Sequence, residues 1–293
     1  HESSLAGAQM AGALLSDCDL SLSNLSGADL NESNFAGCNL EGANLDSACL
    51  VACDLRNTSL KGVSIFASPP TAHLDLRRIR LSGATDLQLL YLQRAIMTGA
   101  DLAGLSLHKC DLSYARLEGA DMSRCDLSYC NLSNANLEGA VLQDALLTGA
   151  CLEGTNVNKC NFSRANFEHA SLLMGGVGAK DAEREWEGVL LQGATGLGAR
   201  DFSNWHFVDC SFDTCDLSNT KFSSARLHRC SVEAVLLVGA DFKDAHCVNT
   251  SFARSNFANA TLKTAVVDGA NFTNAVLTDA DMRKAKMSGC VLH

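Results

Sequence analysis

Fourteen cysteines among 293 residues are the first candidates for redox or metal chemistry. A disulfide framework is typical of short secreted chains whose core is too small to hold itself together, and this chain is long. No Cys-x-x-Cys pair indicates a zinc site. Most of the cysteines instead return at one position of a five-residue pattern, which predicts that they pack as small hydrophobes. These eleven are Cys18, Cys38, Cys53, Cys110, Cys125, Cys130, Cys160, Cys210, Cys215, Cys230 and Cys290.

Histidine and glycine motifs point to no catalytic centre. None of the eight histidines pairs with another at metal-ligand spacing, and no nucleophile motif accompanies them. The stretch GGVGAKD at 175–181 lacks the spacing of a phosphate-binding loop and the Ser or Thr that would follow Lys180. We therefore expect no catalytic residue, no cofactor-binding residue and no metal ligand. We expect that the protein is not an enzyme and needs no cofactor.

Aspartate recurs directly before the large apolar residue of the same pattern, where pairs of carboxylates could suggest acid–base chemistry. The positions face solvent by register and are spread over all sides of the predicted coil, so no paired centre is indicated. Asp and Asn side chains often hydrogen-bond to the backbone of turns, and we predict that role for them. The clearest examples are Asp19, Asp29, Asp101, Asp111, Asp121 and Asp126.

The pattern that places these residues has a period of five. A large apolar residue returns at every fifth position from Leu5 onward, the residue two before it is small, and Asp or Asn often lies between. Eleven of the 12 phenylalanines take the large position, Phe66 being the exception, which fixes the register. Five fits neither the helix period of 3.6 nor the strand period of 2. It fits a chain that turns one corner per repeat, so that four repeats form a square coil of about twenty residues and coils stack ~4.8 Å apart.

The stretches GADLNESNFAGCNLEGANL and CDLSYCNLSNANLEGAVL resemble the A-(D/N)-L-x-x repeats of the pentapeptide-repeat family. The resemblance extends over most of the chain and implies an all-β fold, a right-handed quadrilateral parallel β-helix, which is a solenoid. In each repeat we expect the small residue and the large apolar residue to point inward. The family is functionally diverse, so the resemblance implies much less about activity.

Two stretches interrupt the repeat, and we expect one continuous solenoid domain with two non-repeat insertions. The expected boundaries are block 1 at 1–65, an insertion with a register shift at 66–91, block 2 at 92–177, an insertion at 178–201 and block 3 at 202–293. Pro69-Pro70 favours an exit from the coil, because proline cannot donate to a ladder of backbone hydrogen bonds. We expect a short helix in DLQLLYLQRAI, and Asp181 can cap a brief helix through Trp186.

The two interruptions echo each other as LSGATDL and LQGATGL, which indicates a repeated structural device. Loops held by a rigid scaffold are natural recognition elements. Candidate partner-contact residues in or beside the interruptions are Tyr91, Trp186 and Trp205, since a partly exposed aromatic ring can anchor a partner. The alternative for the two tryptophans is that they cap the discontinuity.

The net charge of −10 combines 23 Lys and Arg with 33 Asp and Glu, interspersed along the chain. This balance argues against a basic nucleic-acid-binding surface, and we expect no direct nucleic-acid binding. No apolar run is long enough for a membrane span, and HESSLAGAQM is no signal peptide. Cysteines predicted as free thiols favour an intracellular reducing compartment, either the cytoplasm or an organelle such as a plastid.

These features predict a non-catalytic protein–protein interaction or scaffold module, a subunit or spacer of a larger assembly, whose partners are proteins. One alternative is a nucleic-acid mimic that binds a DNA-handling enzyme such as a topoisomerase. Resemblance to pentapeptide-repeat proteins that confer resistance to gyrase poisons implies that alternative, although no face here is a clean acidic stripe. A second alternative is the targeting or substrate-binding part of a longer enzyme.

Overall fold

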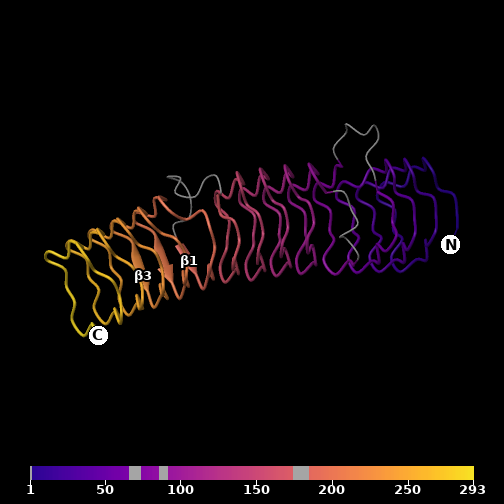
Figure 1. Cartoon of the computed structure of the whole chain (residues 1–293). Coiled ribbons are helices and arrows are strands. Elements are labelled where there is room, and N and C mark those ends of the chain that lie inside the picture. Colours follow the sequence, from indigo (N-terminus) through magenta and orange to yellow (C-terminus); the bar gives the residue numbers. More distant parts are fainter. Residues whose placement is uncertain (1, 66–73, 86–91, 174–184) are drawn as a thin grey trace. The chain divides into compact units, whose positions relative to one another are not determined.

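The computed structural model describes residues 2–65, 74–85, 92–173 and 185–293. They form two compact units. Unit 1 comprises His1–Leu146 and Gly154–Asn161, and unit 2 comprises Leu147–Glu153 and Phe162–His293. Within each unit the chain winds in successive coils (Figure 1). No helix in these ranges is long and apolar enough to cross a membrane.

Parallel β-bridges join each coil to the next at a spacing of twenty residues. In unit 1, Asn24 bridges both Ser4 and Asn44, and in unit 2, Ser231 bridges both Ser211 and Ser251. Backbone hydrogen bonds follow the same spacing, for example from Leu5 N to Asn24 O at 2.7 Å. Each unit is thus a β-solenoid, and the predicted coil of about twenty residues is confirmed.

Three bridges on one face of unit 2 lengthen into strands. They are β1 (Glu185–Glu187), β2 (His206–Val208) and β3 (Arg226–His228), paired in parallel in the order β1-β2-β3. Trp186 aligns with Phe207, and Phe207 aligns with Leu227. The middle residue of each strand is buried while its two neighbours point outward, as the alternation of strand side chains requires.

A tight turn after each large apolar residue produces the period of five. In one example Ser33 N donates to Leu30 O at 3.1 Å, and Glu32 between them has a φ of 59°. A turn with positive φ at its third residue favours glycine, which often occupies this position. At Gly37 the coil itself adds a constraint, because a Cβ there would overlap Asp17 Oδ1 of the neighbouring coil.

The inward positions form the core, as predicted. Ala28 and Leu30 are 0% and 1% exposed in unit 1. Phenylalanines twenty residues apart stack in unit 2, with centroids 4.8 Å apart for Phe222 and Phe242 and 5.2 Å apart for Phe252 and Phe272. These two predicted stacks are confirmed. In the first and last coils the inward residues are only partly buried.

The first interruption is shorter than predicted, because its middle belongs to the coil. Residues 66–73 and 86–91 lie outside the described ranges, but Arg80 bridges Asp54 on one side and Asp101 on the other. These partners are 26 and 21 residues away, so the register shifts in two steps of six residues and one. Ile79 takes the position normally held by a small residue and is buried, which hid the repeat at 74–85. Within the described part of DLQLLYLQRAI, Ile96 bridges Asp75, so the expected helix is wrong there.

The second interruption also rejoins the coil early. Residues 174–184 lie outside the described ranges, and Trp186 lies in strand β1, so the helix that was expected to reach it is wrong at that end. Thr195 bridges Ser171, which is 24 residues back, and Leu190 bridges Ser211, which is 21 residues ahead. The four residues and the one residue added restore the five-residue register. The tryptophan fills a central inward position, and its flanking glutamates point outward.

The LQGATGL segment contains the one-residue enlargement of its coil. Gly196 has a φ of 80°, and a Cβ on it would lie 2.8 Å from the backbone nitrogen of Leu173. Arg200 closes the enlarged corner by donating from Nε to Gly196 O at 3.0 Å and from a terminal nitrogen to Leu172 O at 2.8 Å. In LSGATDL, Asp86 and Leu87 lie outside the described residues, so the likeness of the two segments remains a prediction.

Candidate interaction site

The cysteines are packing residues whose chemistry is suppressed by burial. Cys125 and Cys130 are 0% and 1% exposed, and each thiol donates to a backbone carbonyl of the preceding coil, Leu102 O at 2.8 Å and Leu107 O at 2.7 Å. Burial raises the pKa of both thiols to about 12. Because the thiolate is the reactive form, these side chains are poor nucleophiles at neutral pH. Their predicted role as core filler is confirmed.

The aspartates before the large apolar residues bond to the backbone of their own turns. Ser21 N donates to Asp19 Oδ1 at 3.0 Å, and Ser113 N donates to Asp111 Oδ1 at 2.9 Å. The same contact occurs for the other four residues singled out in the sequence, Asp29, Asp101, Asp121 and Asp126. The predicted turn-stabilising role of all six is confirmed.

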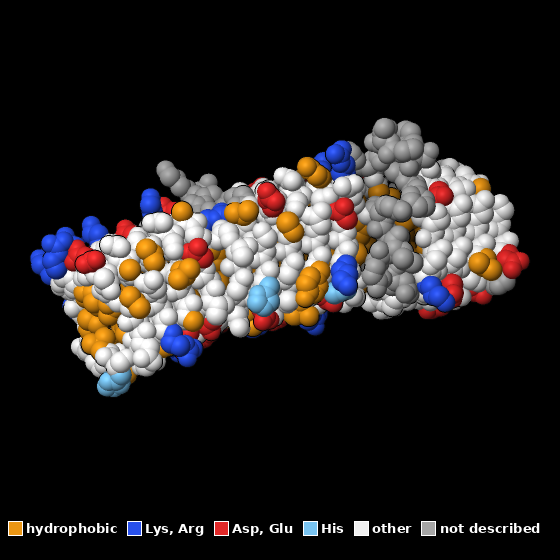
Figure 2. Space-filling model, viewed as in Figure 1, with side chains coloured by type: hydrophobic (Ala, Val, Ile, Leu, Met, Phe, Trp, Pro, Cys, Tyr) orange, Lys and Arg blue, Asp and Glu red, His pale blue; other side chains and the backbone are white. Residues whose placement is uncertain are grey.

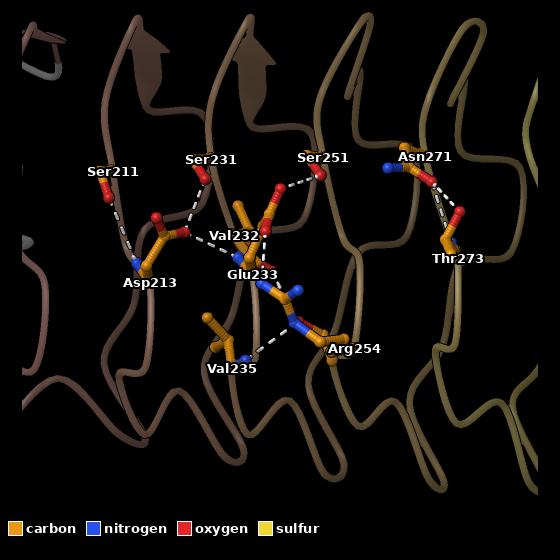
Figure 3. Close-up of polar contacts among 11 residues, drawn as sticks. Ser211, Asp213, Ser231, Val232, Glu233, Val235, Ser251, Arg254, Asn271 and Thr273 are labelled. Atoms are coloured by element: carbon orange, nitrogen blue, oxygen red, sulfur yellow. Dashed lines mark hydrogen bonds and ion pairs between the residues drawn. The ribbon is translucent and has the colours of Figure 1, made fainter.

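Carboxylates one position beyond the large apolar residue join successive coils of unit 2 (Figure 3). Asp213 Oδ1 accepts from Ser231 Oγ at 2.6 Å and from Glu233 N at 2.8 Å. Glu233 in turn accepts from Ser251 Oγ at 2.7 Å and from Arg254 at 2.8 Å. This ladder uses the carboxylate oxygens as acceptors for the next coil, so the arrangement is a structural device and not an acid–base pair.

Arginine partners hold further carboxylates in place. In unit 1, Asp54 is 7% exposed and pairs with Arg56 at 2.7 Å and with Arg80 at 3.1 Å. The hydrogen bond from Arg56 is the main cause that lowers the pKa of Asp54. In unit 2, Arg229 pairs with Asp209 of the neighbouring coil at 2.6 Å. These pairs neutralise acidic charge locally.

The aromatic residues proposed as partner contacts do not form an exposed cluster. Trp186 and Trp205 are 4% and 3% exposed, and their ring centroids lie 5.4 Å apart in an edge-to-face arrangement. They also contact Phe202 and Phe207. The expectation that these two rings are partly exposed is wrong, because the coil there is filled by large aromatics. Tyr91 lies outside the described residues.

The strand-bearing face of unit 2 carries a groove with a volume of about 370 Å³. In each strand the residues on either side of the inward one point out of the same face, so stacked coils raise two parallel rows of side chains. One row is His206, Arg226 and His246, and the other is Val208, His228 and Val248. Inward-pointing Phe207 and Leu227 lie between the rows and form the floor. We call this feature the strand groove.

The strand groove is basic along one row and largely apolar along the other. Arg226 and His246 are exposed, and His206 is half-buried. Val208 and Val248 are half-buried on the opposite row, on either side of His228. Beyond one end lie Glu185 and Glu187 of β1, which align with His206 and Val208. Among the described residues no group of three or more His, Cys, Asp or Glu is placed to hold a metal ion, so the histidines do not form such a site.

Sequence reasoning missed the strand groove because its residues are neighbours only across coils. Histidines were compared at the short spacings of metal ligands, whereas His206, Arg226 and His246 recur every twenty residues. A signal was present, since all three occupy the repeat position that Asp or Asn usually holds. Reading that position down each column would have shown a cationic row in an acidic protein.

A family model described as pentapeptide repeats matches this chain at residues 3–40, 23–62, 85–124, 125–164, 201–233, 236–266 and 255–293. No curated protein sequence matches it.

Solved structures of low identity are also similar. The full-length plasmid-mediated fluoroquinolone resistance protein QnrB1 is 18% identical over 66% of this chain and 91% of its own, with a TM-score of 0.26. HetL, a pentapeptide repeat protein involved in heterocyst differentiation regulation in the cyanobacterium Nostoc, is 23% identical over 97% and 89%, with a TM-score of 0.15. A pentapeptide repeat protein of the Arabidopsis thaliana thylakoid lumen is 24% identical over 49% and 68%, with a TM-score of 0.18.

Proposed function

Because the chain belongs to the pentapeptide-repeat family, we propose that it is a non-catalytic protein-interaction module whose partner binds the strand groove of unit 2. The proposal includes the right-handed quadrilateral winding implied by the resemblance, interrupted by two insertions. A scaffold or spacer role in a larger assembly is the same proposal in its wider setting. The observation that carries it is the strand groove itself, an open surface that combines cationic and apolar side chains.

Elimination of other roles for the described side chains supports this proposal. The thiols are buried, the six turn aspartates bond to their own backbone, and Asp213 and Glu233 join coils. The strand groove, by contrast, projects Arg226 and His246 into solvent beside half-buried valines. A concave surface with an apolar part and a few polar groups is the usual form of a binding site. Its volume of about 370 Å³ falls at the lower end of the range for such sites.

Partner enrichment with paired variants tests the proposal. Tagged wild type, Arg226→Glu and Arg283→Glu would each be used to capture proteins from an extract of the source organism, with quantification by mass spectrometry. Arg283 is 76% exposed and pairs with Asp281 away from the groove, so it controls for a general change of charge. We expect a protein retained by wild type and Arg283→Glu but reduced at least about tenfold by Arg226→Glu. Equal retention by both variants would overturn the groove as the binding surface.

Nucleic-acid mimicry is not favoured by a specific observation. A mimic needs rows of uncompensated negative charge, whereas Asp54, Asp209 and Asp281 each pair with arginine. Figure 2 shows acidic and basic side chains intermixed on the visible face. The strand groove is also cationic along one row. The alternative that the chain is part of a longer enzyme likewise has no supporting contact among the described residues.

A further inference from the structure

We infer that the strand groove binds an extended partner segment in which acidic and apolar side chains alternate. The inference rests on the function proposed for the same groove and adds the chemistry of the partner. It follows from the different character of the two rows, from their separation, and from the charges beyond their ends.

The separation of the rows suits a single extended chain. The two rows stem from residues on either side of one inward residue, so their backbone origins lie about 7 Å apart in a strand. The rows run across three successive coils, from His206 and Val208 to His246 and Val248. Side chains of an extended segment point alternately to opposite sides. A segment that lies along the groove therefore presents one set of side chains to each row.

The two rows select different side chains. Arg226 lies between His206 and His246 in the cationic row, and a guanidinium can pair with a carboxylate through two parallel hydrogen bonds. The opposite row places Val208 and Val248 on either side of His228, so apolar side chains gain most from contact there. The combination requires a partner with acidic groups on one side and apolar groups on the other.

Charges beyond the ends of the groove give the site a direction. On the β1 side, Glu185 and Glu187 extend the two rows and would repel an acidic segment. On the other side the cationic row continues through Val266 to Lys286. Asp209 lies just after Val208 but pairs with Arg229 at 2.6 Å, so its charge is compensated. The acidic segment is therefore expected to extend from β2 toward Lys286, away from β1.

Binding of labelled peptides, followed by fluorescence anisotropy, tests the inference. The first peptide alternates Glu and Val over about nine residues, which spans about 30 Å when extended. The second has the same composition with all Glu in one block, the third alternates Lys and Val, and the fourth carries one phosphoserine and no carboxylate side chains. Each is measured with wild type, Arg226→Gln, Arg226→Glu and Arg283→Glu, and circular dichroism checks that each variant is folded.

We expect the alternating Glu–Val peptide to bind at least about tenfold more tightly than the block peptide, and the Lys–Val peptide not to bind. Arg226→Glu should weaken that binding at least about tenfold, Arg226→Gln should weaken it less, and Arg283→Glu should leave it unchanged. Added salt should weaken it, because the contacts are charged and near the surface.

Equal binding of the alternating and block peptides would overturn the extended arrangement. Tighter binding of the phosphoserine peptide would overturn carboxylate recognition. Absence of binding by every peptide would also overturn the inference, and the partner enrichment then separates the two proposals. A partner still lost by Arg226→Glu would leave the proposed function standing, whereas no groove-dependent partner would remove both.

Discussion

At the scale of single residues, side chains that could do chemistry are occupied by packing and by hydrogen bonds. The thiols of Cys125 and Cys130 donate to carbonyls of the preceding coil. Asp54 is a buried carboxylate in unit 1 and is held by two arginines. Such a group is costly to leave without its partners, because a buried charge needs compensation. The contributions of these residues to stability can therefore be measured separately from function.

Replacement of Asp54 by Asn should destabilise unit 1 by about 1–3 kcal/mol at pH 7, since the ion pairs with Arg56 and Arg80 are lost. Asp75 makes the same kind of pair with Arg77 but is more exposed, so Asp75→Asn is the matched control and should cost less than about 0.5 kcal/mol. Urea unfolding followed by circular dichroism measures both. Equal costs for the two variants would contradict the importance of burial.

The cost of Asp54→Asn should also depend on pH. The folded pKa of Asp54 is lowered below 3.8, mainly by the hydrogen bond from Arg56. Its contribution is therefore fully present above the unfolded value and is lost as the pH falls through the lower folded value. The difference between wild type and variant should shrink below pH 3.8 in the same urea titration. A difference that grows with acidity would reverse the sign of this account.

Replacement of Phe222 by Ala should destabilise unit 2 by about 3–5 kcal/mol, because it leaves a cavity between Phe202 and Phe242. Both tryptophans of the chain belong to unit 2, so their fluorescence during urea unfolding reports on this unit. Val276→Ala is the control, since Val276 is 46% exposed and its removal creates no cavity. A loss of less than about 1 kcal/mol for Phe222→Ala would contradict the stacked core.

At the scale of elements, the coil tolerates departures from twenty residues at a few corners. The LQGATGL segment adds one residue, and Gly196 and Arg200 close the enlarged corner. The glycine is required twice over, by its positive φ and by its approach to the backbone of Leu173. A side chain there would have to displace backbone, which is harder than displacing the end of a flexible side chain.

Gly196→Ala should therefore destabilise unit 2 more than Gly239→Ala. Both glycines have positive φ, which costs about 1–2 kcal/mol for alanine. At Gly239 the added Cβ meets Asn219 Oδ1, which can rotate away, whereas at Gly196 it meets the nitrogen of Leu173. Urea unfolding followed by tryptophan fluorescence compares the two. A smaller loss for Gly196→Ala would show that this corner is not constrained by its neighbouring backbone.

Elements could be predicted from the sequence where each repeat keeps its small and large residues. Leu30 and Phe222 were identified as inward by their five-residue spacing, and both are buried. Residues 74–85 were missed because Ile79 replaces the small residue and the register shifts by six residues and then one. The strand at Trp186 was missed because a single tryptophan between glutamates gives no repeat to count. The strand groove was missed because it depends on columns of residues twenty apart.

At the scale of the whole molecule, repetition separates the roles of the inside and the outside. Inward positions repeat because every coil must cover the next, which is why thiols, phenylalanines and tryptophans all serve as core. Outward positions are freer to vary, and the column that holds His206, Arg226 and His246 departs from the usual Asp or Asn. The proposed function of this protein therefore lies in the surface of particular columns and not in a buried centre.

Site-specific photo-cross-linking tests this conclusion most directly. A benzoylphenylalanine would replace Val248 in the strand groove or, as a control, Val276 on a different outward column of unit 2. After irradiation in an extract of the source organism, cross-linked products would be separated by size and identified by mass spectrometry. The account predicts a defined partner adduct from position 248, lost when Arg226→Glu is added, and none from position 276. An adduct only from position 276, or equal adducts from both, would contradict it.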